Sequence, residues 1–240
     1  MKPAGESPST AEMAGPFITF EGIDGCGKST QLRMLASELR VRGLNVVATR
    51  EPGGTPLGQK LRAALLDVQE QVDPLAELLV FAADRAQHVR KLLLPALAAE
   101  QIVLSDRYAD ATVAYQGSGR GFEPGLIQEI VQLATGGLQP DLTLLFDLSV
   151  AESAVRTRRR VAAKNTDRLD IEDAEFHTRV RDAYLEIARA NPERIRIIDA
   201  RGSVHQTHAA VMDIVLAFLE ERGLLSKEQS ARSKRRDTEG

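Results

Sequence analysis

The sequence predicts an α/β fold in which a five-stranded parallel sheet carries helices on both faces. Short apolar runs recur along the chain and alternate with stretches of helical periodicity, which is the pattern of βαβ crossovers. Capping residues and prolines mark the starts of several helical stretches. The chain has 240 residues, 43% of them hydrophobic, which fits one domain with a sizeable core.

The predicted strands are short β-prone runs between turn residues and helices. They are expected at 17–20, 45–49, 102–105, 142–147 and 194–198. Each connection is long enough to hold at least one helix, so neighbouring strands are expected to run parallel with right-handed crossovers.

The predicted helices fill those connections. They are expected near 31–42, 55–66, 73–90, in a shorter stretch to 100, and near 110–115, 124–135, 150–160, 173–190 and 204–222. Capping signals support the boundaries, namely Thr55-Pro56, Asp73-Pro74, and the capping-box patterns Ser149-x-x-Glu152 and Ser203-x-x-Gln206.

The two ends of the chain differ from its middle in composition. Residues 1–15 are rich in Pro, Ser, Gly, Ala and Glu, and residues 225–240 hold few apolar side chains. Such segments bury too little apolar surface to fold, so both are expected to be disordered tails. The folded unit is expected to be a single domain over 16–224.

Charge and cysteine content narrow the class of protein. The 31 Lys and Arg against 34 Asp and Glu leave a net charge of −3, which does not favour a nucleic-acid or membrane-surface binder. Cys26 is the only cysteine, so no intrachain disulfide can form. Neither a secretory signal nor a spanning apolar run is recognisable, so a cytoplasmic enzyme is expected.

The most specific motif is Gly22-x-x-x-x-Gly27-Lys28-Ser29, which follows the first predicted strand and opens a helix. In that context glycines let backbone N–H groups surround phosphates, the lysine reaches the β- and γ-phosphates, and the hydroxyl is offered to Mg²⁺. A glycine-rich turn without a ligand is the alternative. The motif predicts a three-layer P-loop NTPase fold that binds a nucleoside triphosphate, ATP being the first candidate, through Gly22, Ile23, Asp24, Gly25, Cys26, Gly27, Lys28, Ser29 and Thr30.

Polar residues follow the other predicted strands. Arg50 and Glu51 come after the second, Asp106 and Arg107 after the third, and Asp147 after the fourth. Ligands of open α/β sheets bind at the carboxyl ends of the strands. The carboxylate of Asp106 could therefore hold Mg²⁺ or its water while Arg107 clamps phosphoryl oxygens, although a surface ion pair is an alternative.

Several motifs together resemble the bacterial thymidylate kinases over 17–222. They are FEGIDGCGKSTQ at 20–31, TREPGGTPLG at 49–58, LLVFAADRAQH at 78–88, DRYADATVAYQGSGRG at 106–121, PDLTLLFDL at 140–148 and DRLD at 167–170. The resemblance implies transfer of the γ-phosphoryl group of ATP to dTMP, with Mg²⁺ as cofactor. It also implies a homodimer that pairs through helices after the second and third strands.

Phe81 and Arg85 lie four residues apart, on one face of a predicted helix. A ring beside a guanidinium suits a pyrimidine, although an isolated Phe is more often part of the core. The resemblance assigns Phe81 to stacking on thymine and Arg85 to its O4. By the same resemblance the dTMP-binding residues are Asp24, Arg50, Phe81, Arg85, Arg107, Thr112, Tyr115 and Gln116.

The resemblance gives four of these residues individual roles. Arg50 is expected to contact the acceptor phosphate and Asp24 the sugar 3′-hydroxyl. Tyr115 is expected to crowd a ribose 2′-hydroxyl, and Gln116 to meet the base edge. Ordinary packing at a helix end is the alternative for Tyr115 and Gln116.

A basic stretch from Arg156 to Arg168 lies between two helical patterns. It is expected to form a short mobile lid over about 156–170, although a solvated helix face is the usual reading of such a run. In bacterial members of the family the lid supplies charge to the transferring phosphoryl group. The resemblance points to Arg160, with Arg158 and Arg168 as alternates, acting with Lys28 and Arg107.

Two further functions remain open from the sequence. One is a kinase for another pyrimidine nucleotide or for a deoxynucleoside, against which Arg50 argues because its phosphate contact would be idle. The other is a non-enzymatic nucleotide switch, which would need a guanine-reading Asn-Lys-x-Asp that the sequence lacks. The spacing of the four histidines in the sequence does not indicate a metal site. Cys26, near a helix N-terminus, is expected to be alkylated readily in the absence of ATP.

Overall fold

A computed structural model describes residues 15–66, 71–162 and 172–225, without the side chains of 159–162. Its centre is a five-stranded sheet in the order β2-β3-β1-β4-β5. Every neighbouring pair of strands is parallel. The strands are β1 (Phe17–Glu21), β2 (Val46–Arg50), β3 (Ile102–Asp106), β4 (Leu142–Asp147) and β5 (Ile195–Asp199). The predicted parallel sheet is confirmed.

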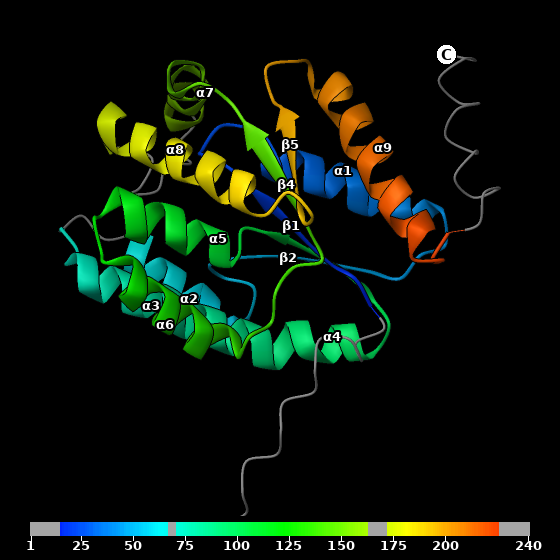
Figure 1. The fold of residues 1–240 in the computed structure, drawn as a ribbon, viewed down its shortest axis with the longest axis horizontal. Coiled ribbons are helices and arrows are strands. Elements are labelled where there is room, and N and C mark those ends of the chain that lie inside the picture. Colours follow the sequence, from blue (N-terminus) through cyan, green and yellow to red (C-terminus); the bar gives the residue numbers. More distant parts are fainter. Residues whose placement is uncertain (1–14, 67–70, 163–171, 226–240) are drawn as a thin grey trace, which may run out of the picture.

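Helices cover both faces of this sheet (Figure 1). Helices α1 and α9 pack on one face, and α8 and α4 pack on the other. The helices are α1 (Lys28–Val41), α2 (Pro56–Leu66), α3 (Pro74–His88), α4 (Leu94–Ala98), α5 (Ala109–Thr112), α6 (Pro124–Thr135), α7 (Val150–Ala162), α8 (Ala174–Ala190) and α9 (Val204–Glu221), with π-helical segments η2 (Val89–Leu93) and η3 (Val113–Gly119).

The central strand β1 is buried on both faces, which explains its continuous apolar run. Ile18 and Phe20 pack in the cluster formed with α1 and α9. Phe17 packs in the cluster on the opposite face with η2 and α4. Successive side chains of a strand point to opposite faces, so a strand between two helical layers needs apolar residues at adjacent positions.

The capping signals in the sequence act as expected. The Asp73 carboxylate accepts hydrogen bonds from the N–H groups of Leu75 and Ala76. Ser203 and Gln206 form a reciprocal capping box at the start of α9. Such caps satisfy backbone donors that the first helical turn leaves unpaired.

One predicted helix is longer than the sequence pattern indicates. The helix expected near 110–115 begins as α5 and continues as η3 to Gly119. Glycines usually end helices, but here Gly119 lies against α8, and a Cβ added to it would be 2.7 Å from the Phe176 ring. Tertiary packing therefore keeps a glycine inside a helical segment, which local propensity does not predict.

The folded part extends one residue beyond each predicted boundary. The N–H of Gly15 donates to Leu97 O at 3.3 Å. Leu225 is buried in the cluster with α1 and α9. The rest of the two expected tails, 1–14 and 226–240, lies outside the described residues. Among the described helices, none combines the length and apolar character needed to cross a bilayer.

Candidate active site

A cavity of about 430 Å³ lies where the phosphate loop, the ends of β2 and β3, and helices α3, α5 and α7 meet. Parallel strands of an open sheet bring their following loops to one edge, which is where ligands bind. The cavity is lined by Asp24, Gly25, Gly27, Lys28, Ser29, Thr30, Arg33, Arg50, Glu51, Pro52, Arg62, Leu66, Phe81, Arg85, Asp106, Arg107, Ala111, Thr112, Tyr115, Gln116 and Arg156.

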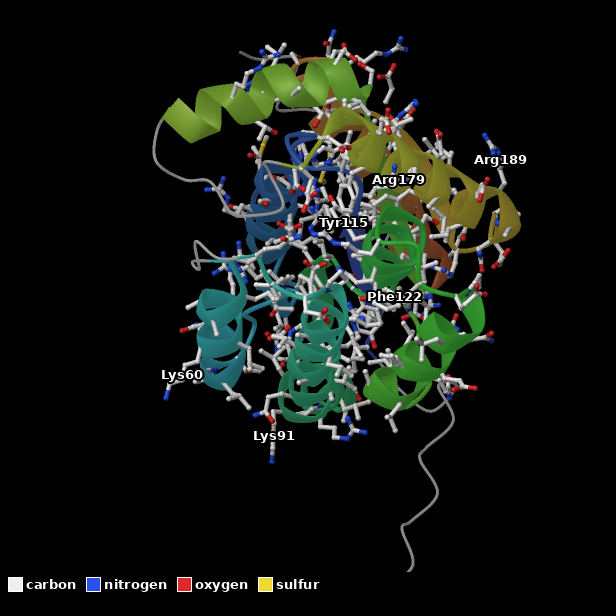
Figure 2. The ribbon with its side chains drawn as sticks, turned by 90° about the vertical axis from the view of Figure 1, so that its left-hand side faces the viewer. Lys60, Lys91, Tyr115, Phe122, Arg179 and Arg189 are labelled. Carbon is white, nitrogen blue, oxygen red and sulfur yellow. The ribbon has the colours of Figure 1, made fainter. Side chains whose placement is uncertain are left out.

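The cavity unites residues that the sequence scatters over four motifs. Of the predicted ATP- and dTMP-binding residues, the loop residues Gly22, Ile23 and Cys26 do not reach its wall, whereas the others do. Tyr115 lies inside the molecule in Figure 2, whereas Lys60 and Lys91 point outward. These two lysines therefore lie away from the cavity.

The phosphate loop follows β1 and ends at Gly27, which has a left-handed conformation directly before α1. A Cβ at Gly22, where φ is 134°, would lie 2.5 Å from Phe146 O, so this position requires glycine. The side chain of Lys28 folds back along the loop, and its Nζ donates to Gly22 O at 2.8 Å and to Ile23 O at 2.9 Å. The lysine is thus held within the loop that it is expected to serve.

Ser29 and Asp106 meet at the mouth of the loop. The Ser29 hydroxyl donates to Asp106 Oδ2, although the two residues are 77 positions apart. A hydroxyl oxygen beside a carboxylate oxygen is the kind of donor set that Mg²⁺ prefers. The predicted metal residues are therefore neighbours in the structure.

Asp24, Arg107 and Tyr115 form a compact hydrogen-bonded group. Arg107 Nη2 donates to Asp24 Oδ1 at 2.6 Å, and the Tyr115 hydroxyl donates to Asp24 Oδ2 at 2.8 Å. Burial alone would raise the pKa of Asp24, but the charges of Arg107 and Lys28 and the Tyr115 bond hold this pKa well below its usual range. The phosphate loop can therefore carry the Asp24 carboxylate, because the Arg107 guanidinium neutralises its charge.

Arg107 adopts a left-handed backbone conformation, with φ 72°. That conformation is uncommon for a residue with a side chain, and it turns the chain sharply after β3. The guanidinium lies over the Tyr115 ring, 4.7 Å from its centroid. The turn and the ring together aim Arg107 at the phosphate loop.

Glu21 stabilises the turn that follows β3. The sequence pattern did not indicate this role. Its carboxyl accepts from the N–H of Tyr108 at 2.6 Å and from the hydroxyl of Tyr184 at 2.7 Å. Complete burial, and then the nearby charge of Asp110, raise the pKa of Glu21 to about 8. A glutamate at a strand end looks like a surface residue, so only tertiary structure identifies it as the support of Arg107.

Replacing Glu21 with glutamine is expected to make stability less sensitive to pH. Because the folded-state pKa of Glu21 is raised, to about 8, its contribution to stability is present below pH 4.5 and is lost as the pH rises toward 8. The unfolding free energy of Glu21→Gln relative to wild type should therefore increase over this window, by at most about 1.4 kcal/mol per pH unit.

Urea denaturation at pH 5, 6.5 and 8 measures this difference. Glu129→Gln makes the same chemical change at an exposed position of α6 and is the matched control. A stability difference between Glu21→Gln and wild type that stays constant from pH 5 to 8 would contradict the assignment.

Helix α3 presents Phe81 and Arg85 to the cavity, as their spacing predicts. Arg85 is 3% exposed. Its Nε donates to Glu51 Oε2 at 2.8 Å, and its Nη1 donates to Thr112 Oγ1 at 2.7 Å. The ring of Phe81 also packs against a core cluster, so the same residue serves the core and the cavity wall.

Arg50, unlike Arg85, does not use its guanidinium to bind another described residue. Its side chain is exposed, lines the cavity, and makes no hydrogen bond or ion pair with any residue that the structure describes. An unpaired guanidinium in a cavity suits a carboxylate or a phosphate. Its position at the carboxyl end of β2 leaves it available to a ligand.

Gln116 is buried at the far wall of the cavity. Its Nε2 donates to Glu77 Oε1 at 2.8 Å, and Arg120 donates to the same carboxylate. The orientation of the Gln116 amide is therefore set by Glu77, with its nitrogen toward that carboxylate.

The first half of the expected lid is helical. Residues 156–162 belong to α7 and not to a mobile loop. Arg156 Nη2 donates to Ala200 O at 3.0 Å, and Ser153 Oγ donates to Asp24 O at 2.6 Å, so α7 is anchored near the phosphate loop. These anchors lie far apart in the sequence, and the local pattern does not reveal them.

Of the three lid arginines, Arg158 is the one whose side chain is described, and it does not line the cavity. Arg158 is exposed, and its Nε donates to Ala154 O within its own helix. The side chain of Arg160 and all of Arg168 lie outside the described residues. Arg156, which the sequence analysis did not nominate, does line the cavity.

The burial of Cys26 opposes its expected reactivity. Cys26 is 2% exposed, which removes the basis for ready alkylation.

Asp147 accepts a bidentate ion pair from Arg181 and does not line the cavity. Within the described ranges no group of three or more His, Cys, Asp or Glu could hold a metal ion.

Basic groups predominate around the cavity. Seven of the lining residues are Lys or Arg, and three are Asp or Glu. The whole chain carries a net charge of −3. The cavity is therefore a positive region on an acidic protein.

Comparisons with known proteins identify relatives over most of the chain. The family model described as thymidylate kinase matches residues 20–211. The thymidylate kinase of Geotalea uraniireducens is 48% identical over 211 residues, 86% of this chain and 99% of that protein. That of Gloeobacter violaceus is 48% identical over 206 residues, 85% of this chain and 96% of that protein.

A solved structure has the same fold. The crystal structure of thymidylate kinase from Ehrlichia chaffeensis matches with a TM-score of 0.70 and 36% sequence identity. The match covers 85% of this chain and 99% of that chain.

Proposed function

The chain belongs to the thymidylate kinase family, and we propose how its own residues transfer the γ-phosphoryl group of ATP to dTMP, the reaction by which such enzymes make dTDP and ADP. The observation that carries the proposal is one cavity that joins a phosphate loop to an acceptor pocket. Lys28 of the loop and Arg50, Phe81 and Arg85 of the pocket line the same cavity.

The phosphate loop, from Gly22 to Thr30, binds ATP. Its backbone N–H groups and the start of α1 hold the phosphates. Lys28 leaves the carbonyls of Gly22 and Ile23 to reach the β- and γ-phosphates, where it neutralises charge in the transition state.

Mg²⁺ is the cofactor, held by Ser29 and, directly or through water, by Asp106. The neighbouring hydroxyl and carboxylate oxygens fit this hard cation. Bound with ATP, the ion supplies charge neutralisation on the β- and γ-phosphate oxygens. Chelation with EDTA should stop turnover, and excess Mg²⁺ should restore it; turnover that persists in EDTA would contradict the cofactor.

The acceptor pocket recognises dTMP by its base, sugar and phosphate. Phe81 stacks on the thymine ring, and Arg85, already oriented by Glu51 and Thr112, donates to O4. Glu77 holds the Gln116 nitrogen, so the Gln116 oxygen faces the base edge, where the N3–H of thymine is a donor. A cytosine ring would bring an amino group to the Arg85 donors and would be rejected.

The sugar and the phosphate are held at the mouth of this pocket. Asp24 accepts from the 3′-hydroxyl, and Tyr115, bonded to the same carboxylate, crowds the position of a ribose 2′-hydroxyl. Arg50 clamps the acceptor phosphate, because its guanidinium lines the cavity and makes no hydrogen bond or ion pair with any residue that the structure describes.

Catalysis needs no protein nucleophile, because an oxygen of the dTMP phosphate attacks the γ-phosphorus in line and ADP leaves. Lys28, Arg107 and a lid arginine stabilise the charge on the transferring group. Arg160 is proposed for the lid, with Arg158 and Arg168 as alternates, on the basis of the family resemblance. Alanine variants of the three identify the active one as that whose kcat falls by more than about a hundredfold.

The experiment that tests the function is ADP production from ATP and Mg²⁺ with dTMP, dUMP, dCMP, UMP, AMP, GMP or thymidine as acceptor. Turnover is expected to be strongest with dTMP and weak with UMP. Best turnover with thymidine or another pyrimidine nucleotide would favour the alternative kinases. No stimulation by any acceptor would favour the nucleotide switch.

Arg85→Ala tests the base-reading role in the same assay and is expected to lower kcat/KM for dTMP by about a hundredfold or more. Circular dichroism and an unfolding curve must accompany it, because removing Arg85 leaves Glu51 buried with one partner fewer. Unchanged discrimination between dTMP and dCMP in folded Arg85→Ala would contradict the role.

The protein is proposed to be a single cytoplasmic domain over 16–224 that forms a homodimer. Leucines are exposed on neighbouring helices α2, α3 and α6: Leu57, Leu75, Leu79, Leu126 and Leu133. A second copy would cover this face, and the family resemblance supports pairing through helices. A monomer mass by light scattering would contradict the dimer, and cell fractionation tests the location.

A further inference from the structure

His88 lies at the end of α3 and is completely buried. Its Nδ1 is 2.8 Å from Glu51 Oε1, and its Nε2 is 2.8 Å from Thr49 Oγ1. Thr49 and Glu51 are the residues on either side of Arg50. A single imidazole therefore holds the chain on both sides of the arginine assigned to the acceptor phosphate.

Glu51 also connects His88 to the base-reading arginine. Its Oε1 meets His88, and its Oε2 accepts from Arg85 Nε at 2.8 Å. Glu51 is itself buried, and its backbone N–H donates to Asp106 O at 2.9 Å. One carboxylate thus fixes the loop of Arg50 and the side chain of Arg85 relative to each other.

The packing around the imidazole leaves it little freedom. A Cβ added to Gly54 would lie 2.6 Å from His88 Nε2 and 2.6 Å from Thr49 Oγ1. The carboxylate of Asp84, one turn earlier on α3, accepts from the N–H of Gly53 at 3.1 Å. The loop after β2 is therefore held to α3 at several points, and His88 is the one that reaches both neighbours of Arg50.

We propose that His88 is a positioning residue of the acceptor site, which sets the spacing between the phosphate-binding Arg50 and the base-reading Arg85 through Thr49 and Glu51. The inference rests on the proposed function, because that function assigns both arginines to dTMP. His88 touches no substrate. It acts by holding two cations at the separation of the base and the phosphate of one nucleotide.

Two substitutions separate the two bonds of the imidazole. In His88→Gln, the amide nitrogen of the new side chain can occupy the place of Nε2 and keep the bond to Thr49, but the bond to Glu51 is lost. In His88→Asn, the shorter amide can occupy the place of Nδ1 and keep the bond to Glu51, but the bond to Thr49 is lost. Hydrogen bonds to charged groups are the stronger class, so the loss of the Glu51 bond is expected to matter more.

Steady-state kinetics with dTMP and ATP varied in turn is the test. His88→Gln is expected to raise KM for dTMP about tenfold or more, His88→Asn about threefold, and both should leave KM for ATP within about twofold of wild type. Thr49→Val removes the hydroxyl alone and should match His88→Asn. His208→Gln makes the same change on α9, where Nδ1 bonds Gln31, and should leave both KM values unchanged.

A merely structural histidine would behave differently. Its loss would lower the unfolding midpoint and the folded fraction without separating the two KM values. Equal rises of both KM values, equal effects of the Gln and Asn variants, or an unchanged KM for dTMP would each overturn the proposal.

If His88→Gln does not fold, Thr49→Val and His88→Asn still test the proposal. It is overturned if KM for dTMP in both of these variants lies within experimental error of the wild-type value. Failure of the proposed function is distinguishable, because wild type itself would then show no dTMP-dependent turnover.

Discussion

Replacing Lys28 with methionine is expected to lower kcat by about three orders of magnitude or more, because the ammonium group is the loop's fixed charge on the transferring phosphoryl group. Methionine has nearly the same length and fits the buried position. The carbonyls of Gly22 and Ile23 lose a donor, which should cost about 1–3 kcal/mol of stability for each.

Coupled measurement of ADP production with saturating dTMP gives kcat for Lys28→Met, and an unfolding curve shows whether the variant is folded. Lys60→Met is the matched control, because Lys60 points outward from α2 (Figure 2). A folded Lys28→Met enzyme that retains more than about a tenth of wild-type kcat would contradict the role of Lys28 in the transition state.

Replacing Arg50 with alanine is expected to raise KM for dTMP about a hundredfold, with no loss of stability. The guanidinium is exposed and has no partner among the residues that the structure describes, so its removal breaks no internal bond. The preference for dTMP over thymidine should fall in the same variant, because a nucleoside has no phosphate for Arg50 to bind.

Arg50→Lys should recover part of the affinity, since lysine keeps the charge but loses the bidentate geometry. Arg189→Ala, at an outward-pointing position of α8, is the control (Figure 2). If KM for dTMP and the ratio of dTMP to thymidine turnover were both unchanged in Arg50→Ala, another group would have to bind the acceptor phosphate.

The sheet and the phosphate loop could be predicted from sequence because their signals are local. Each strand is a short apolar run, and the spacing from Gly22 to Ser29 is a pattern within one loop. The expectation that Arg50 and Arg107 lie near that loop followed from a topological rule for parallel sheets. The structure brings Ser29, Arg50 and Arg107 to one cavity.

The supporting residues could not be predicted, because their roles depend on contacts between distant segments. Glu21 reaches Tyr184, 163 residues away, and His88 reaches Thr49, 39 residues away. Nothing in the local pattern distinguishes either residue from an ordinary surface glutamate or core histidine. The anchoring of α7 was not predicted for the same reason, since Arg156 donates to the carbonyl of Ala200, 44 residues away.

The contrast between the basic cavity and the acidic chain has a kinetic consequence. Nucleotides approach a molecule that repels them at long range and attracts them near the cavity mouth, where charges of one sign focus the field. At 0.1 M salt the repulsion beyond about 10 Å is already largely screened, so a further rise in ionic strength weakens mainly the attraction near the cavity mouth. Association of ATP and dTMP should therefore slow as ionic strength rises, whereas dissociation, governed by contacts inside the cavity, should change less.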